Sequence, residues 1–160
     1  MKVSITSNQE LASGIWQMDM TGDFPFNNVQ AGQFVHIQVG EGLNHVLRRP
    51  ISIAEVNSEE KRLTIVYRVV GEGTKWLSQQ TVGKSLDLLG PLGNGFQVEK
   101  STRSLIVGGG IGIPPLYELA KRLAEQGEIV DIILGFRTTN EVFWKERFTT
   151  FGNVQVYTED

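Results

Sequence analysis

Apolar and polar residues alternate in short runs over the first hundred residues of the chain. Trp16, Met18 and Met20 are separated by polar residues, and the same period of two recurs at residues 35–39 and 63–69. This period is typical of β-strands that bury one face. Glycine and asparagine clusters separate the runs. Several short strands at this spacing predict a small, closed antiparallel barrel.

The period changes after residue 100. A continuous apolar run at 105–107, typical of a strand buried on both faces, leads through glycines into a predicted helix with apolar residues at helical spacing. A strand at 129–136, a helix at 141–151 and a strand at 154–157 complete a parallel α/β unit. The sequence therefore predicts a barrel domain at 1–100 and part of an α/β nucleotide-binding domain at 101–160. Doubly wound domains normally contain more strands, so we expect the second domain to be incomplete.

Composition narrows the class of protein. The 160 residues carry a net charge of −3, and their basic residues form no extended patch, which argues against nucleic acid. No apolar run reaches the roughly 18 residues of a membrane span, and the N-terminus lacks an apolar signal core, so we expect a cytoplasmic protein. The chain has no cysteine, and His36 and His45 have no third ligand nearby in sequence. We therefore expect no metal site.

Residues 48–52 combine two arginines with a proline. Pro50 biases Arg49 toward an extended backbone, which suits a strand that presents its edge to a ligand. Arg49 could then pair with phosphate oxygens, while Ser52 or the adjacent backbone approaches a flavin ring. The alternative is a pair of solvated surface arginines.

Residues 71–74, Gly-Glu-Gly-Thr, follow a predicted strand and precede a short predicted helix. The free N–H groups of a helix start can hold a diphosphate, with the hydroxyl of Thr74 beside it. The alternative is a turn in which Thr74 only caps the helix. By alternation Arg68 points to the opposite face from Tyr67, beside Thr64 and Val66, and a half-exposed edge strand would explain that pattern equally well.

The glycines at 108–112 open the predicted helix after a buried strand, which is the context of a nucleotide loop. They do not form the dinucleotide pattern G-x-G-x-x-G, because Ile113 occupies the position of the last glycine. A nicotinamide or a phosphate could rest on this backbone, or the glycines could simply permit a tight turn. Arg137 ends the next strand, where α/β sheets bind ligands, and Thr138 or Thr139 could cap the following helix.

Together these segments resemble the ferredoxin reductase-like flavoproteins and, more narrowly, the electron-transfer subunits of B-type dihydroorotate dehydrogenases. The resemblance rests on residues 47–52, 65–69, 71–74, 89–96 and 107–115. It implies an oxidoreductase that carries FAD on the barrel and binds NAD on the α/β half. It assigns FAD to Arg49, Pro50, Ile51, Ser52, Val66, Tyr67, Arg68, Gly73 and Thr74, and NAD to Gly109, Gly110, Gly112, Pro114 and Arg137. Ser52 is the candidate for tuning the reactive flavin nitrogen.

The resemblance also implies a partner, a catalytic subunit that oxidises dihydroorotate with FMN in pyrimidine synthesis, within a hetero-oligomer. In that family a cysteine-rich segment holds a [2Fe–2S] cluster that relays the electrons, and this chain has no such segment. We therefore expect a truncated form that holds FAD, binds NAD weakly or not at all, and has an exposed sheet edge prone to self-association. Two alternatives remain open. One is the small subunit of a sulfide dehydrogenase or of an NADH-dependent ferredoxin:NADP oxidoreductase, and the other is a catalytically silent docking module.

Overall fold

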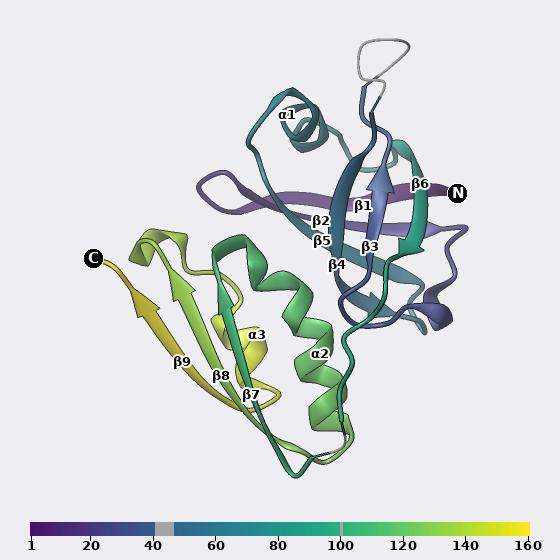
Figure 1. Ribbon diagram of the computed structural model, residues 1–160. Helices are drawn as coiled ribbons and strands as arrows, with labels where there is room; N and C mark the ends of the chain where they lie inside the picture. Colours follow the sequence, from purple (N-terminus) through teal and green to yellow (C-terminus); the bar gives the residue numbers. More distant parts are fainter. Residues whose placement is uncertain (41–46, 100) are drawn as a thin grey trace.

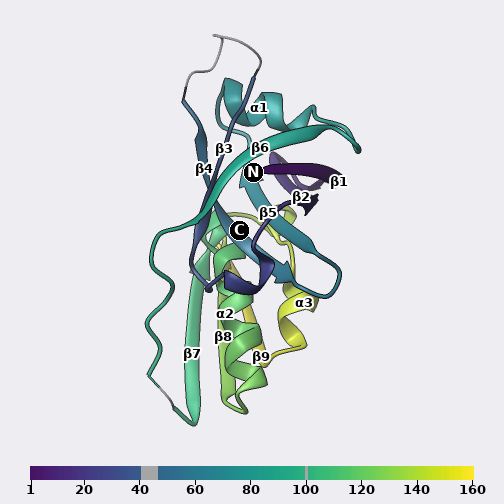
Figure 2. The ribbon, with the colours of Figure 1, turned by 90° about the vertical axis from the view of Figure 1, so that its right-hand side faces the viewer.

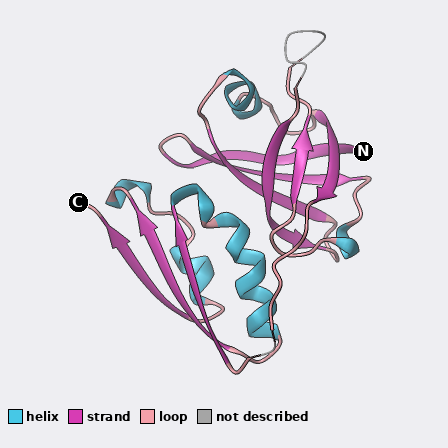
Figure 3. Ribbon diagram, viewed as in Figure 1, coloured by secondary structure: helices cyan, strands magenta, loops and turns pink. Residues whose placement is uncertain are grey.

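The computed structural model describes residues 1–40, 47–99 and 101–160. It contains an antiparallel barrel followed by a parallel sheet with helices (Figures 1 and 3). Its strands are β1 Lys2–Ala12, β2 Ile15–Gly22, β3 Phe34–Ile37, β4 Arg49–Asn57, β5 Arg62–Arg68, β6 Ser85–Leu92, β7 Arg103–Gly109, β8 Ile129–Phe136 and β9 Asn153–Thr158. Its helices are α1 Glu72–Ser78, α2 Pro114–Glu125 and α3 Lys145–Thr149, with short 3-10 turns at Phe26–Asn28, Gly110–Gly112 and Thr139–Glu141.

The barrel closes in the strand order β1-β2-β5-β4-β3-β6. The inward positions of its alternating strands form one core, in which Met18, Val35 and Ile65 are completely buried. Because the side chains along a strand alternate between two faces, the residues between these positions point out of the barrel. The predicted antiparallel barrel is confirmed.

The second half is a parallel sheet in the order β7-β8-β9. One face of the sheet, which includes Ile106, Ile132 and Leu134, packs against α2 and α3 in a second core. On the opposite face Leu105 and Val107 stay 64% and 63% exposed. The structure thus leaves one face of the sheet uncovered, whereas the expectation concerned the sheet's edge; the exposed edge and the self-association remain predictions.

The two halves share their second core, and polar contacts cross the same boundary. Ile15, Ala54 and Val66 point out of the barrel and are buried against the α/β half. The Trp144 indole N–H donates to Gln17 Oε1 at 3.1 Å, and both side chains are buried. This shared core fixes the barrel relative to the sheet. In the side view the barrel lies above the parallel sheet and its helices (Figure 2).

Arg147 connects the halves a second time. Its guanidinium bonds to Glu55 Oε2 at 2.7 Å and lies 4.4 Å and 4.2 Å from the ring centroids of Tyr117 and Trp144. Glu55 is only 8% exposed, and Arg62 is its second cationic partner at 3.1 Å. A buried carboxylate paired in this way ties β4 and β5 to α3.

The predicted helix at 141–151 is wrong in its extent. The structure has a 3-10 turn at Thr139–Glu141, extended residues, and then α3 at Lys145–Thr149 only. Trp144 has φ 59°, a left-handed conformation that interrupts an α-helix. Phe143 and Trp144 are both buried, so packing of these aromatic side chains overrides the helical pattern.

The division predicted at residue 100 falls on a residue outside the described ones. The barrel's last strand ends at Leu92 and the sheet's first strand begins at Arg103, and the division into domains remains a prediction. In the described part of the chain, no helix is long and apolar enough to cross a membrane.

Candidate functional site

A cleft opens where two neighbouring strands of the barrel diverge. The first half of β4 pairs with β3, through Phe34↔Ser52 and Ile37↔Arg49, whereas its second half pairs with β5 from Ile53 onward. The start of β4 and the end of β5 therefore separate and leave a cleft of about 400 Å³. We call it the barrel cleft; it is lined by Arg49, Pro50, Ile51, Ser52, Val66, Tyr67, Arg68, Val70, Thr74 and Ile111.

Arg49 lies over the first turn of α1, and Gly73 makes room for it. A Cβ on Gly73 would lie 2.7 Å from Arg49 Nε and 3.0 Å from Val39 Cγ2. The guanidinium donates to the carbonyl oxygen of Leu47 at 2.7 Å and has no carboxylate partner among the described residues. A cation held beside this turn without an acidic partner is suited to an anionic ligand.

Arg48 has a different role. Its guanidinium pairs with Asp87 Oδ1 at 2.6 Å and also donates to the Asp87 carbonyl oxygen at 2.9 Å. This hydrogen bond lowers the pKa of the Asp87 carboxyl below its ordinary value. Arg48 thus joins the start of β4 to β6 through Asp87. Of the two arginines, Arg49 is the one that lines the cleft.

Thr74 caps its own helix. Its hydroxyl oxygen accepts hydrogen bonds from the amides of Val70 and Gly71, at 3.0 Å and 3.2 Å, and its proton is donated to the Gly71 carbonyl oxygen. The capping interpretation is therefore confirmed, and ligand binding by the same hydroxyl stays a prediction. Since α1 has seven residues, Arg49 rather than a helix dipole is the main source of positive charge here.

Tyr67 faces the barrel core, although the residue also borders the cleft. Its ring is 1% exposed and its hydroxyl donates to Asn8 Oδ1 at 3.1 Å. Asn8 in turn donates to the carbonyl oxygens of Leu77 and Gln80, at 3.1 Å and 2.8 Å, at the end of α1. Burial raises the pKa of the Tyr67 phenol, so it stays neutral and acts as an anchor for α1.

Arg68 points to the opposite face from Tyr67, as alternation predicts. The explanation by an edge strand is wrong, because β5 lies between β2 and β4 in the closed barrel. On this face Val66 is 4% exposed because it is buried in the core shared with the α/β half, and Thr64 is 0% exposed and donates to Asp19 Oδ1 at 2.7 Å. Arg68 reaches across to Glu141 with an N–O distance of 3.4 Å.

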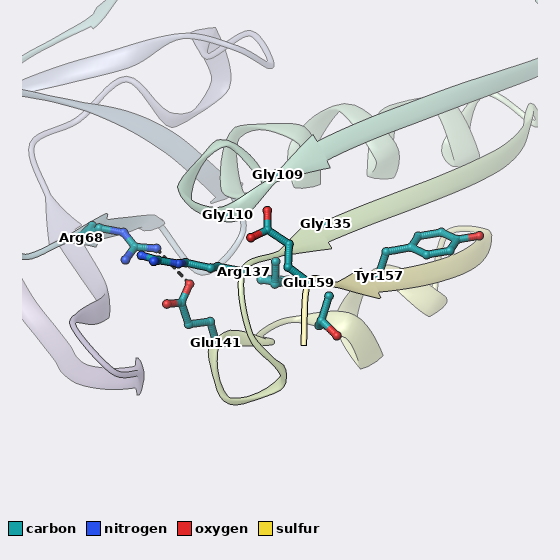
Figure 4. Close-up of a pocket in the computed structure, with 10 residues that line it drawn as sticks. Arg68, Gly109, Gly110, Gly135, Arg137, Glu141, Tyr157 and Glu159 are labelled. Carbon is teal, nitrogen blue, oxygen red and sulfur yellow. Dashed lines mark hydrogen bonds and ion pairs between the residues drawn. The ribbon is translucent and has the colours of Figure 1, made fainter.

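A second cleft, of about 620 Å³, lies at the carboxyl ends of the parallel strands and shares Arg68 with the first (Figure 4). Figure 4 shows Arg68 extending from the barrel toward Glu141. The guanidinium of Arg137 has no ion-pair partner among the described residues. We call this the strand-end cleft; it is lined by Arg68, Gly109, Gly110, Gly135, Phe136, Arg137, Glu141, Tyr157, Thr158 and Glu159.

Two residues predicted to bind nucleotide lie outside the strand-end cleft. Gly112 is exposed and Pro114 is buried in the first turn of α2, and neither lines the cleft. Thr138 occupies the N-cap position of the 3-10 turn Thr139–Glu141, but its side chain makes no capping hydrogen bond, and the residue at the N-cap of α3 is Trp144. Instead Asp160 accepts the Thr139 amide at 3.0 Å, and this hydrogen bond lowers the pKa of the Asp160 carboxyl.

Sequence reasoning missed several residues that line the clefts. Val70 and Ile111 border the barrel cleft, and Glu141 and Glu159 border the strand-end cleft. The rule that ligands bind at the carboxyl ends of parallel strands pointed to Arg137 and, applied to the last strand, would have found Glu159. Of the described residues, no group of histidine and acidic side chains could hold a metal ion, and His45 lies outside the described residues.

The structure is similar to flavin-dependent reductases of known structure. It matches one described as "NADH-dependent reduced ferredoxin-NADP oxidoreductase" with a TM-score of 0.88 and 30% identity, over 98% of this chain and 56% of that one. Phthalate dioxygenase reductase matches with a TM-score of 0.83 and 21% identity, over 99% of this chain and 51% of that one. The chain therefore has the ferredoxin reductase-like fold.

In sequence the chain is similar to the proteins named "Dihydroorotate dehydrogenase B (NAD(+)), electron transfer subunit". The one from Bacillus pumilus is 48% identical over 99% of this chain, and the one from Fusobacterium nucleatum is 45% identical over 98%. In both comparisons this chain spans 62% of the relative's length. No protein-family model matches the chain.

Proposed function

We propose that the barrel cleft binds FAD and the strand-end cleft binds NAD(H), as parts of an oxidoreductase that moves electrons between them. The observation that supports this proposal most strongly is the convergence of residues 49–52 with residues 66–68, 70 and 74 on one cleft. A guanidinium with no acidic partner in the described part of the chain, that of Arg49, lies at the start of α1 in that cleft, where Gly73 leaves it room. These groups fit a dinucleotide whose diphosphate carries the charge.

The chain's own residues position and separate the two ligands. Arg49 would hold the FAD diphosphate, residues 66–68 would lie beside its ring system, and Ser52 would tune its reactive nitrogen; all of these residues line the barrel cleft. Arg68 lines both clefts, and its pairing with Glu141 fixes it between them. Bound FAD supplies hydride exchange with nicotinamide and single-electron exchange with a further acceptor.

We further propose that the protein serves as the electron-transfer subunit for a dihydroorotate dehydrogenase catalytic subunit that contains FMN. The relatives' shared name supports this role. The electrons would pass through a [2Fe–2S] cluster that this cysteine-free chain cannot hold with cysteines. A second candidate is the small subunit of a sulfide dehydrogenase or an NADH-dependent ferredoxin:NADP oxidoreductase. The structural similarity to NADH-dependent reduced ferredoxin-NADP oxidoreductase, with a TM-score of 0.88, favours the latter. A silent docking module is a third.

A reconstitution experiment tests FAD binding. The purified protein is incubated with FAD and desalted, and the flavin absorption bands are recorded. We expect wild type to retain the bands, Arg49→Met to lose them, and the control Arg103→Met to retain them, because Arg103 pairs with Asp131 on a different surface. A colourless wild-type protein would contradict the proposal and favour the docking module.

A second measurement tests the exchange between the clefts. Anaerobic NADH should bleach the bound flavin, and Ser52→Ala should slow the bleaching without releasing FAD. An unchanged rate in Ser52→Ala would reject the role of this hydroxyl.

A further inference from the structure

The outer face of β3, β4 and β6 carries apolar side chains although no part of the described chain covers it. Cross-strand pairs place Pro50, His36 and Leu89 in one row, and Ser52, Phe34 and Leu92 in the next. The intervening Val35 and Ile37 are buried in the barrel core, so these rows point outward. We call Phe34, His36, Pro50, Leu89, Leu92 and Phe96 the outer patch.

The glycine-rich segment 89–96, to which the proposed cofactor sites assign no role, builds half of this patch. Gly90 and Gly93 have φ values of +154° and +80°, and a Cβ on Gly90 would lie 2.9 Å from Val35 Cγ1. These glycines let the backbone lie flat against β3. As a result Leu89 and Phe96 are left 52% and 45% exposed.

Aromatic rings in the patch also lie over glycines. A Cβ on Gly93 would meet the Phe34 ring at 2.8 Å, and one on Gly32 would meet the Phe96 ring at 2.9 Å. The His36 ring lies 5.5 Å from that of Phe34. The rings therefore lie close to the barrel surface and form a low apolar face, of the kind found at the centre of protein interfaces.

A second outward-facing apolar surface of the same barrel is covered by another part of the protein. On the other side, Ile15, Ala54 and Val66 also point out of the barrel, and the α/β half buries each of them to 4% exposure or less. The barrel cleft lies between the two apolar faces, because Ser52 and Pro50 on one side and Val66 on the other all line it.

From this arrangement we infer that the outer patch is the docking surface for the FMN-containing catalytic subunit of the proposed function. The inference rests on the proposed function. A partner seated there would approach the cofactor from the side opposite the nucleotide-binding half, so both can be bound at once. Arg48, the cation beside the patch, is already paired with Asp87. We therefore expect an apolar partner surface and an affinity that depends weakly on salt.

The test measures binding of the FAD-loaded protein to an FMN-containing dihydroorotate dehydrogenase catalytic subunit by surface plasmon resonance. We expect Leu89→Asp and Leu89→Lys to weaken binding at least tenfold while FAD stays bound. Equal losses with opposite charges would identify an apolar contact. The matched control is Val82→Asp, which places the same charge on a 67% exposed valine before the start of β6, outside the outer patch. The Val82→Asp protein should bind as tightly as wild type does.

Three outcomes would overturn the inference. They are no binding by a wild-type protein that retains FAD, unchanged affinity in both Leu89 variants, and a dimer of this chain that Leu89→Asp dissociates. Failure of the proposed function looks different, because wild type would then not retain FAD at all. Phe34→Ser supplies a second variant on the neighbouring row, and its thermal unfolding is recorded to verify that it folds.

Discussion

Gly73→Ala should separate folding from cofactor binding. Alanine favours a helix over glycine by about 0.5–1 kcal/mol, which offsets the 3.0 Å contact that its Cβ would make with Val39. We therefore expect the apoprotein's free energy of unfolding to change by less than about 1 kcal/mol. The same Cβ would lie 2.7 Å from Arg49 Nε, and this flexible side chain must move away.

Displacing Arg49 removes a charge-assisted contact with the FAD diphosphate. Such contacts contribute about 1.5–3 kcal/mol, so Gly73→Ala should weaken FAD binding roughly 10- to 150-fold. Calorimetric titration of the apoprotein with FAD measures this change. Gly71→Ser is the control, because a Cβ there meets nothing within 4 Å and its φ is extended.

A double-mutant cycle decides whether Arg49 transmits the effect. In an Arg49→Met background, Gly73→Ala should change FAD affinity little, because the displaced group is already absent. If Gly73→Ala costs as much affinity in that background as in wild type, the reasoning is refuted.

Three further predictions concern stability and association. Arg48 lowers the pKa of Asp87 in the folded protein, so Asp87→Asn should be less stable than wild type at neutral pH. Urea unfolding at a series of pH values should show that this difference in stability vanishes as the pH falls through the lowered pKa. Arg147→Met should lower the free energy of unfolding by roughly 1–3 kcal/mol, since it leaves Glu55 with fewer partners and removes the stacking on two rings; an unchanged urea midpoint would contradict this. Val107→Lys should reduce concentration-dependent self-association in sedimentation velocity, and equal association of both proteins would exclude the uncovered sheet face.

The sequence predicted the fold class and the approach of distant segments because its strongest signals are local. The period of two marks the inward positions of the barrel, and the apolar run at 105–107 marks the parallel sheet. These patterns fixed which face each residue occupies, including the opposite directions of Tyr67 and Arg68.

Features that depend on contacts between the halves could not be predicted in the same way. Val66 is buried against elements of the α/β half that are distant in the sequence, so alternation alone suggested an edge strand. Trp144 interrupts the predicted helix because its ring packs beside Tyr117 and its N–H reaches Gln17. The hydrogen bond from the Tyr67 hydroxyl to Asn8 likewise joins residues that are far apart in the sequence.

Hydrogen exchange of the protein with and without FAD tests the central claim most directly. If segments 49–52, 66–70 and 71–74 surround one dinucleotide, their amides should gain protection together on addition of FAD, while β9, at the far edge of the sheet, changes little. Protection confined to one of the three segments, or found only elsewhere in the chain, would contradict a shared FAD site.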